Sequence, residues 1–230
     1  MAREYGAFTL LDAAQAMGLL KLRFSYLKAD AITFAGHKTL YAPFGIGGFL
    51  LKTGVDLEEL LAGGNGMKSL SEDMPRYMPE KMECGSMDTP AIAGLQASLQ
   101  WLKTAKPKKI EDDLMKYLIP QLREIPGLHL YCAPDPTLQA GVVSLNLDGF
   151  RANEVGAILD KEWDIAVRAG HHCAARIHKH LKDQEFDGTV RVSLSAFTTK
   201  EELDTLVKAL KSIDRDMLKG ISSSVLRGNC

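Results

Sequence analysis

Residues 32–51 read Ile-Thr-Phe-Ala-Gly-His-Lys-Thr-Leu-Tyr-Ala-Pro-Phe-Gly-Ile-Gly-Gly-Phe-Leu-Leu, and this stretch decides how the first part of the chain folds. An apolar run ends in a polar turn that carries His37 and Lys38, and a loop rich in proline and glycine leads to a second apolar run. The pattern predicts strands at 31–34 and 48–51, with the lysine held at the end of the first. A lysine becomes reactive where its surroundings favour the neutral amine, because that amine condenses with carbonyl groups.

The composition is typical of a protein with a packed core and no excess of charge. Among 230 residues, 46% are hydrophobic and 25% are charged, and the formal net charge is -1. This balance argues against binding to nucleic acid or to a membrane surface. We find no run as long as a membrane span, no signal peptide and no CxxC spacing among the four cysteines, so we expect a cytoplasmic protein with reduced thiols.

The first part of the chain, residues 1–105, contains short apolar runs bounded by turn signals. We expect a strand at 8–11 before the two around Lys38, then a capped helix at 56–61 and a long irregular loop. A helix follows from Pro90, and its apolar side chains share one face: Ile92, Leu95, Leu99 and Leu102. The opening strands are apolar enough for the interior of a parallel or mixed sheet covered on both faces, which indicates the end of a larger domain.

Pro107 interrupts the helical pattern and marks the boundary of a second part, residues 106–230. After a helix at about 110–122, the pattern predicts the order β-β-α-β-α-β-α, a small α+β domain. The expected strands lie at 128–132, 142–147, 165–168 and 189–194, and the expected helices include 152–161 and 200–213. The fold class is therefore α/β, with a mixed, mostly parallel sheet followed by a small α+β domain.

Polar side chains follow the first two predicted strands. Asp12 and Gln15 come after the first strand, and His37 and Lys38 come after the second. If these strands are neighbours, their C-terminal ends meet at the sheet edge where α/β proteins bind ligands. An acid and a lysine there could grip opposite sides of a flat heteroaromatic ring, as pyridoxal phosphate requires. The spacing alone leaves a plainer alternative, in which Asp12 caps a turn and Lys38 is solvated.

Several motifs, in the right order, resemble the class V aminotransferase family and, more narrowly, its cysteine desulfurase and selenocysteine lyase branch. They are Leu-Asp-Ala-Ala-Gln at 11–15, Ala-Gly-His-Lys at 35–38, Gly-Ser at 85–86, Asp-Thr-Pro-Ala-Ile-Ala-Gly-Leu at 88–95 and Ile-Ala-Val-Arg-Ala-Gly-His-His-Cys-Ala at 165–174. The resemblance covers nearly all of this chain but only the C-terminal part of the family's length. It implies a fold-type I enzyme, with residues 1–105 as the end of the cofactor-binding large domain plus a connecting helix, and 106–230 as the small domain.

The resemblance also implies which residues hold pyridoxal 5'-phosphate. Lys38 forms the Schiff base and later moves protons, and Asp12 pairs with the pyridinium nitrogen. Gln15 bonds the phenolic oxygen of the ring, and His37 reaches the phosphate. Ser86 matches a hydroxyl residue that contacts the phosphate of the partner subunit's cofactor, which implies a homodimer.

Three further residues are assigned to the substrate by the same resemblance. Arg168 and Arg191 match arginines at the substrate, and Arg191 would clamp its carboxylate, a task that suits a planar bidentate donor. Cys173 matches the nucleophile that takes sulfur from L-cysteine as a persulfide and leaves L-alanine. A nearby cation favours a thiolate, and His171, His172 and Arg168 are the candidates. The implied activity is cysteine desulfurase, which would pass sulfur to an acceptor protein for iron–sulfur or thio-cofactor assembly.

Other interpretations stay open on the sequence. A selenocysteine lyase or another C–S lyase of the family fits the same motifs, and an inactive remnant could act as a dimerisation or sulfur-relay module. The family's N-terminal half carries the aromatic residue that stacks on the ring, and no segment here matches it. We therefore expect a fragment, a truncated product or half of a split enzyme, and leave open the activity of the chain alone.

The remaining cysteines and histidines have plainer interpretations. Cys84 and Cys132 are expected to pack as small apolar side chains, and Cys230 to have no special role. His178 and His180 lie on a helix with basic neighbours, so we expect both to be solvated. The immediate adjacency of His171, His172 and Cys173 suits a tetrahedral metal site poorly, so no metal site is predicted.

Overall fold

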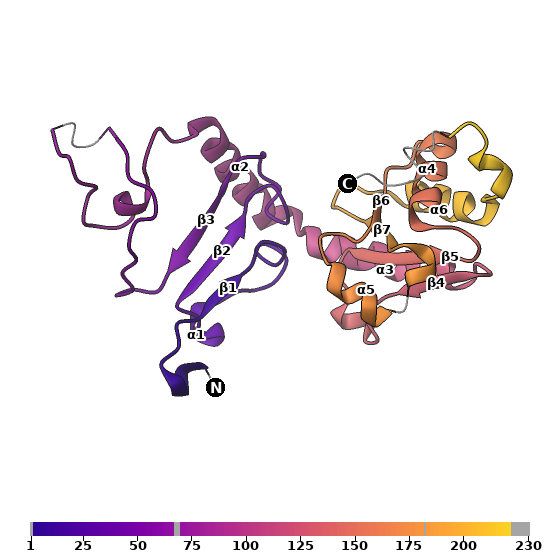
Figure 1. Ribbon diagram of the computed structural model, residues 1–230, viewed down its shortest axis with the longest axis horizontal. Coiled ribbons are helices and arrows are strands. Elements are labelled where there is room, and N and C mark those ends of the chain that lie inside the picture. The colour runs from indigo at the N-terminus through magenta and orange to yellow at the C-terminus, as the bar shows by residue number, and fades with distance from the viewer. Residues whose placement is uncertain (1, 67–69, 182, 222–230) are drawn as a thin grey trace. The chain divides into compact units, whose positions relative to one another are not determined.

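Two sheets organise the structure, one in each of the units Met1–Ala105 and Lys106–Cys230 into which the chain divides. The computed structural model describes residues 2–66, 70–181 and 183–221. Across these ranges no helix is both long and apolar enough to cross a membrane. Helices accompany both sheets, so the predicted α/β class is confirmed (Figure 1).

The first unit is built on a mixed sheet in the order β1-β2-β3 (Figure 1). β1 (Leu10–Asp12) runs parallel to β2 (Ala31–Ala35), and β3 (Gly47–Leu51) pairs with the other edge of β2 in the antiparallel sense. Asp12 lies opposite Thr33, so the C-terminal ends of β1 and β2 lie side by side. The other elements are η1 (Ala2–Tyr5), α1 (Phe24–Leu27), η2 (Glu80–Met82) and α2 (Thr89–Ala105).

The described part of the first unit exposes much of its apolar surface. Its buried cluster consists of Ala13, Ala29 and Ile32, with half-buried neighbours such as Leu11. Several large apolar side chains that the pattern places inside are instead half-exposed: Phe8 (53%), Leu10 (59%), Ile92 (40%) and Leu99 (43%). β1 begins two residues later than the strand predicted at 8–11, whereas α2 carries the predicted apolar residues, and within the described part of the chain neither element is fully covered.

Residues 56–61 form no helix, so that prediction was wrong. The Asp56 carboxylate, which we expected to cap the helix, instead accepts a hydrogen bond from the Lys81 ammonium at 3.0 Å. A segment this short has too few backbone hydrogen bonds to be stable without a packed face. Leu60 and Leu61 provide none, because they are 92% and 70% exposed.

The second unit is built on an antiparallel sheet in the order β4-β5-β7-β6 (Figure 1). The strands are β4 (Leu128–Tyr131), β5 (Val142–Leu147), β6 (Arg168–Gly170) and β7 (Thr189–Ser193). The helices are α3 (Pro107–Arg123), α4 (Ala152–Trp163), α5 (Ala175–Leu181) and α6 (Lys200–Ser212), with 3-10 turns η3 (Pro136–Leu138), η4 (Gln184–Phe186) and η5 (Arg215–Leu218). The observed order is the predicted one.

Alternation along the strands gives the second sheet one apolar face and one polar face. Val143 and Leu145 of β5 and Val190 of β7 pack in a single core with apolar side chains of α3, α4 and α6. Successive residues of a strand point to opposite faces, so Ser144 and Arg191 lie on the face away from that core. The candidate substrate residues therefore lie on the polar face.

Two predicted boundaries of the second unit were wrong. The helical pattern is interrupted before Pro107 as predicted, but the helix expected from about residue 110 already begins at Pro107, because Lys106 takes a left-handed φ of 49° and proline needs no N–H at the first helical position. The strand expected at 165–168 lies at 168–170, because α4 continues to Trp163 and ends on Asp164 with a φ of 54°. The shift places Arg168 within the sheet, directly opposite Arg191.

Replacing Leu118 with alanine is expected to lower the free energy of unfolding by about 2–5 kcal/mol, because the side chain is fully buried and leaves a cavity. Urea unfolding followed by circular dichroism measures the change. Leu138 is 76% exposed, and Leu138→Ala is expected to change the same quantity by less than about 0.5 kcal/mol. Equal effects of the two changes would contradict the assignment of the core.

Candidate functional site

The carboxyl ends of β1 and β2 are tied together by backbone and side-chain hydrogen bonds. The N–H of Ala13 donates to the carbonyl oxygen of Thr33 at 2.9 Å, which extends the parallel ladder by one residue. Further along, the Thr39 hydroxyl donates to the carbonyl oxygen of Met17 at 2.6 Å. The segment that carries Asp12 and Gln15 is therefore fixed against the turn that carries His37 and Lys38.

The turn after β2 leaves no room for a larger residue at Gly36. The N–H of Gly36 donates to the carbonyl oxygen of Ile46 at 2.8 Å, and its own carbonyl accepts from the N–H of Ala42 at 2.9 Å. A Cβ atom on Gly36 would lie 2.6 Å from Cγ2 of Ile46. The glycine lets the Pro/Gly-rich loop fold back against the strand and fixes the backbone just before Lys38.

The side chains at this edge are accessible. Asp12, Gln15, His37 and Lys38 are all exposed, and the imidazole of His37 stacks on the Phe44 ring with centroids 4.9 Å apart. One oxygen of Asp12 accepts from the N–H of Ala14 at 2.9 Å, as in the plainer interpretation, and its other oxygen can take a further donor. The structure thus brings a carboxylate, an amide, an imidazole and an amine to one edge.

Ser86 is exposed in the loop before α2. The next helix is fixed by Asp88, whose carboxylate accepts from the N–H of Ala91 at 3.0 Å. That cap positions the end of the loop, and we did not predict it from the sequence. Acid residues at the start of a helix are nonetheless a common signal of this arrangement.

In the second unit, the turn after β6 presents Cys173 to solvent beside a cation. A guanidinium nitrogen of Arg168 donates to the sulfur of Cys173 at 3.2 Å, and Cys173 is exposed. Both His172 and Cys173 take left-handed backbone conformations, with φ of 51° and 60°. Such conformations cost about 1–2 kcal/mol per residue, so other contacts must hold this turn.

His172 supplies one of those contacts. Its Nε2 lies 2.9 Å from the carbonyl oxygen of Thr189 and 2.9 Å from the Thr189 hydroxyl, and the carbonyl can only accept. Nε2 therefore carries the proton. Burial of the ring, followed by the positive charge of Arg191, lowers the pKa of His172 below its usual value. The turn is thus held by a neutral imidazole.

Arg191 lies in β7 directly opposite Arg168 of β6. Its Nε atom is buried and has no hydrogen-bond partner among the residues that the structure describes. Arg191, His172 and Ser144 line the same hollow of about 600 Å³ on the polar face of the sheet. A guanidinium that lines a hollow is suited to an anionic ligand such as a carboxylate, because it carries several N–H donors in one plane.

His178 contradicts the expectation that it is solvated. It is only 6% exposed and bonds Asp183, which is 1% exposed, whereas His180 is exposed as predicted. Helical spacing does not indicate this burial, because the neighbouring Ile177 is 52% exposed and the partner Asp183 lies beyond the end of α5. Thr189, the partner of His172, had no signal in the sequence either.

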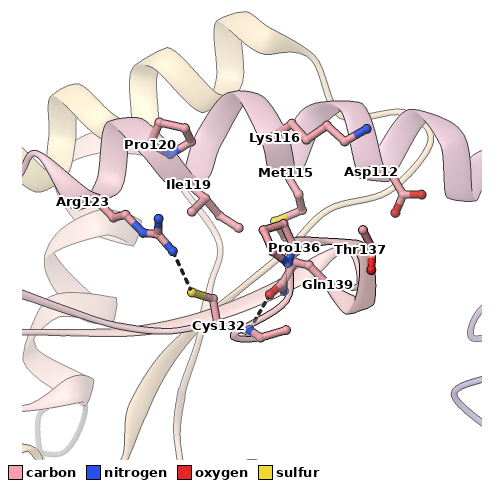
Figure 2. A pocket seen from close by; sticks show the side chains of 11 residues that line it. Asp112, Met115, Lys116, Ile119, Pro120, Arg123, Cys132, Pro136, Thr137 and Gln139 are labelled. Carbon is pink, nitrogen blue, oxygen red and sulfur yellow. Dashed lines mark hydrogen bonds between the residues drawn. The ribbon is translucent and has the colours of Figure 1, made fainter.

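Cys132 lies at a second cavity of the same unit, of about 410 Å³, between α3 and the segment that follows β4 (Figure 2). Figure 2 shows Arg123 reaching from α3 toward Cys132, and the guanidinium lies 3.7 Å from the sulfur. Cys132 is half-buried and packs against the core, which confirms the expected packing role. Its longer contact and lower exposure distinguish it from Cys173.

Comparisons with known proteins point to one family. The family profile described as aminotransferase class V matches residues 1–206. A probable cysteine desulfurase of Methanothermobacter thermautotrophicus is 34% identical over 220 residues, which are 93% of this chain and 54% of the relative. A cysteine desulfurase of Escherichia coli O127:H6 is 37% identical over 224 residues, which are 94% of this chain and 53% of the relative.

Solved structures give the same likeness. The apo cysteine desulfurase of Thermococcus onnurineus NA1 superposes with a TM-score of 0.81 at 31% identity, over 91% of this chain and 53% of that one. A cysteine desulfurase of Escherichia coli in an S-sulfonic acid form gives a TM-score of 0.76 at 28% identity, over 91% of this chain and 52% of that one. The chain thus spans about half the length of the relatives it matches.

The lowered pKa of His172 predicts a pH dependence of stability. In an NMR titration, the ring protons of His172 are expected to shift at a lower pH than the value of about 6.5 for a histidine in a short peptide. The unfolded chain takes up this proton before the folded chain does. The contribution of His172 to the free energy of unfolding therefore falls as the pH drops below about 6.5.

The variant Arg191→Gln separates the two causes that lower the pKa of His172, namely burial of the ring and the charge of Arg191. Removing the positive charge is expected to raise the pKa of His172 partway toward its usual value, while burial of the ring continues to lower it. An unchanged midpoint would show that the charge of Arg191 does not act on the ring.

Proposed function

The chain belongs to the aminotransferase class-V family, and on that basis we propose that it carries the C-terminal half of a pyridoxal-phosphate-dependent cysteine desulfurase. The predicted resemblance and fold class are confirmed: the chain has the fold of the end of a fold-type I large domain with its small α+β domain. The observation that best supports the activity is the exposed Cys173 sulfur, which lies 3.2 Å from a guanidinium nitrogen of Arg168.

The residues at the ends of β1 and β2 fit pyridoxal phosphate by the chemistry of their side chains. Asp12 would pair with the ring nitrogen, Gln15 with the phenolic oxygen and His37 with the phosphate, while the Lys38 amine would hold the aldehyde carbon. All four are accessible at one sheet edge. Pyridoxal phosphate, when bound, supplies an electron sink that stabilises negative charge on the α carbon of an amino acid.

The proposed roles of the other residues follow from their charge and placement. Arg191, which lines the hollow, would bind the carboxylate of L-cysteine through its guanidinium group. Lys38 would take the α-proton and return a proton to the product. The Cys173 thiolate would attack the substrate sulfur, so that the C–S bond breaks, an S–S bond forms on Cys173, and L-alanine leaves.

Arg168 would support this attack through its charge. A guanidinium that donates to a sulfur atom favours the thiolate form, which is the nucleophile. Exposure of Cys173 would then allow a sulfur-acceptor protein to collect the bound sulfur. We place the enzyme in the cytoplasm and expect a homodimer, in which Ser86 would contact the phosphate bound by the partner.

The exposed apolar surface of the first unit is suited to packing against a further segment of polypeptide. The sheet of the first unit has β1 and β3 as its outer strands, and within the described residues each of them pairs only with β2. Large apolar side chains of these outer strands are 41–59% exposed: Leu10 of β1, and Phe49 and Leu50 of β3. The register places Leu10 and Phe49 on one face of this sheet and Leu50 on the other, and strands that are apolar on both faces are normally covered on both. The matched relatives are about twice as long and would contain such a segment.

Borohydride reduction in the presence of pyridoxal phosphate is expected to label Lys38 with a pyridoxyl group, because its amine is held at the proposed site. Peptide mass spectrometry measures the label. Lys38→Arg is expected to abolish it, whereas Lys52→Arg, at the exposed end of β3, is expected to leave it in place. Labelling spread evenly over surface lysines would contradict the assignment of Lys38.

The native chain with pyridoxal phosphate and a reducing thiol is expected to form alanine and sulfide from L-cysteine. Cys173→Ala is expected to reduce this rate at least about 100-fold, because it removes the nucleophile. Cys132→Ala is the matched control, and the native rate is expected, because Cys132 packs against the core. Equal rates for the native chain and Cys173→Ala would exclude the persulfide role, and no product from the native chain would contradict the proposed activity of this chain.

A further inference from the structure

The second unit contains a buried imidazole–carboxylate pair that the proposed reaction does not use. His178 is in the last turn of α5, and its Nδ1 lies 2.5 Å from an oxygen of Asp183. The two side chains are 6% and 1% exposed. Ionisable groups are rarely buried without pairing, and the pairing here is a single short hydrogen bond.

The surroundings of the pair fix where the protons lie. Nε2 of His178 lies 3.2 Å from the carbonyl oxygen of His171, which can only accept, so Nε2 carries a proton. Nδ1 and the Asp183 oxygen form a hydrogen bond, because two lone pairs without a proton between them would repel at 2.5 Å. The second oxygen of Asp183 has no hydrogen-bond partner in the part of the chain that the structure describes. Asp183 therefore acts on the ring of His178 and holds Nε2–H toward the carbonyl of His171.

That carbonyl belongs to the turn that presents the proposed nucleophile. It also accepts from the N–H of Ala174 at 2.8 Å, on the far side of Cys173, and the His171 ring meets the His178 ring edge-on at 4.8 Å. His172 and Cys173 lie between His171 and Ala174, and both have left-handed backbone conformations. A bond to the His171 carbonyl therefore restrains the start of the strained segment.

We propose that His178 and Asp183 are positioning residues, which hold the His171–Cys173 turn so that the Cys173 sulfur stays beside the Arg168 guanidinium. The inference rests on the proposed function in one respect, namely that Cys173 is the nucleophile. Three contacts join the turn to its surroundings in the described part of the chain: the His178 bond to His171, the His172 bond to Thr189 and the Arg168 bond to Cys173. The pair does not touch the sulfur and acts through the backbone.

A purely structural role would not require this pair. Well-packed apolar side chains of similar volume often replace a buried charged pair without loss of stability. Such side chains could fill the space between α5 and Asp183, but they could not donate to the carbonyl of His171. The proposed role and the space-filling role therefore predict different behaviour for an apolar replacement.

The experiment measures alkylation of Cys173 by iodoacetamide in the full chain, by peptide mass spectrometry, in the variant His178→Leu/Asp183→Leu. The rate at Cys173 is expected to fall about fivefold, the effect of losing one hydrogen bond that holds the thiol beside its cation. The rate at Cys132 is expected to stay unchanged. Circular dichroism checks that the variant unfolds at the same temperature as the native chain.

Two further variants isolate the bond to His171. His178→Gln/Asp183→Leu places an amide N–H where Nε2 lies and is expected to restore most of the Cys173 rate. His178→Asn keeps a donor to Asp183 but cannot reach the carbonyl, so it is expected to lower the rate as the leucine pair does. It also provides the test if the leucine pair unfolds.

The control is the exposed pair His129 and Asp148, whose Nε2 and carboxylate oxygen lie 2.6 Å apart in the same unit. His129→Leu/Asp148→Leu is expected to leave the Cys173 rate unchanged. A native or faster rate at Cys173 in folded His178→Asn and in the leucine pair would overturn the proposal. Alkylation requires neither cofactor nor turnover, so this outcome is distinct from a failure to form alanine, which concerns the proposed activity.

Discussion

The parallel hydrogen bonding between β1 and β2 is the constraint on which the candidate cofactor site depends. It aligns Asp12 with Thr33, and the bond from Ala13 to Thr33 carries the alignment past the end of the strand. A slip of one residue would turn Asp12 to the opposite face of the sheet. Because Gly36 anchors the following turn to Ile46, the ladder also fixes the backbone that carries Lys38.

In the second unit, one face of the sheet packs in the hydrophobic core and the opposite face carries the candidate substrate residues. Apolar residues of β5 and β7 face α3, α4 and α6 and supply the buried surface. The alternate residues are left for polar contacts, and the hollow and the Cys173 turn lie on that side. Hydrophobic burial therefore supplies the free energy that holds strained and charged groups in place, such as two consecutive left-handed residues.

Sequence patterns predicted features that depend on local periodicity and failed where tertiary contacts decide. The alternation in β5 and the helical spacing in α6 gave their bounds within one residue, because each buries one regular face. The segment 56–61 had the signals of a helix but no surface to pack against. The burial of His178 depends on Asp183, which follows the end of α5, and only the fold brings that carboxylate to the ring. The roles given to Lys38 and Cys173 came from matching motifs.

The register of β6 and β7 has an electrostatic consequence for the face of the sheet that carries both arginines. Arg168 and Arg191 are directly opposite each other, and like charges in that relation repel. The contact of Arg168 with sulfur disperses part of this repulsion when the sulfur is ionised. An anion that enters between the two guanidinium groups would remove the rest. The two opposed positive charges therefore make this face of the sheet electrostatically favourable for an anion, which would act as an internal counterion.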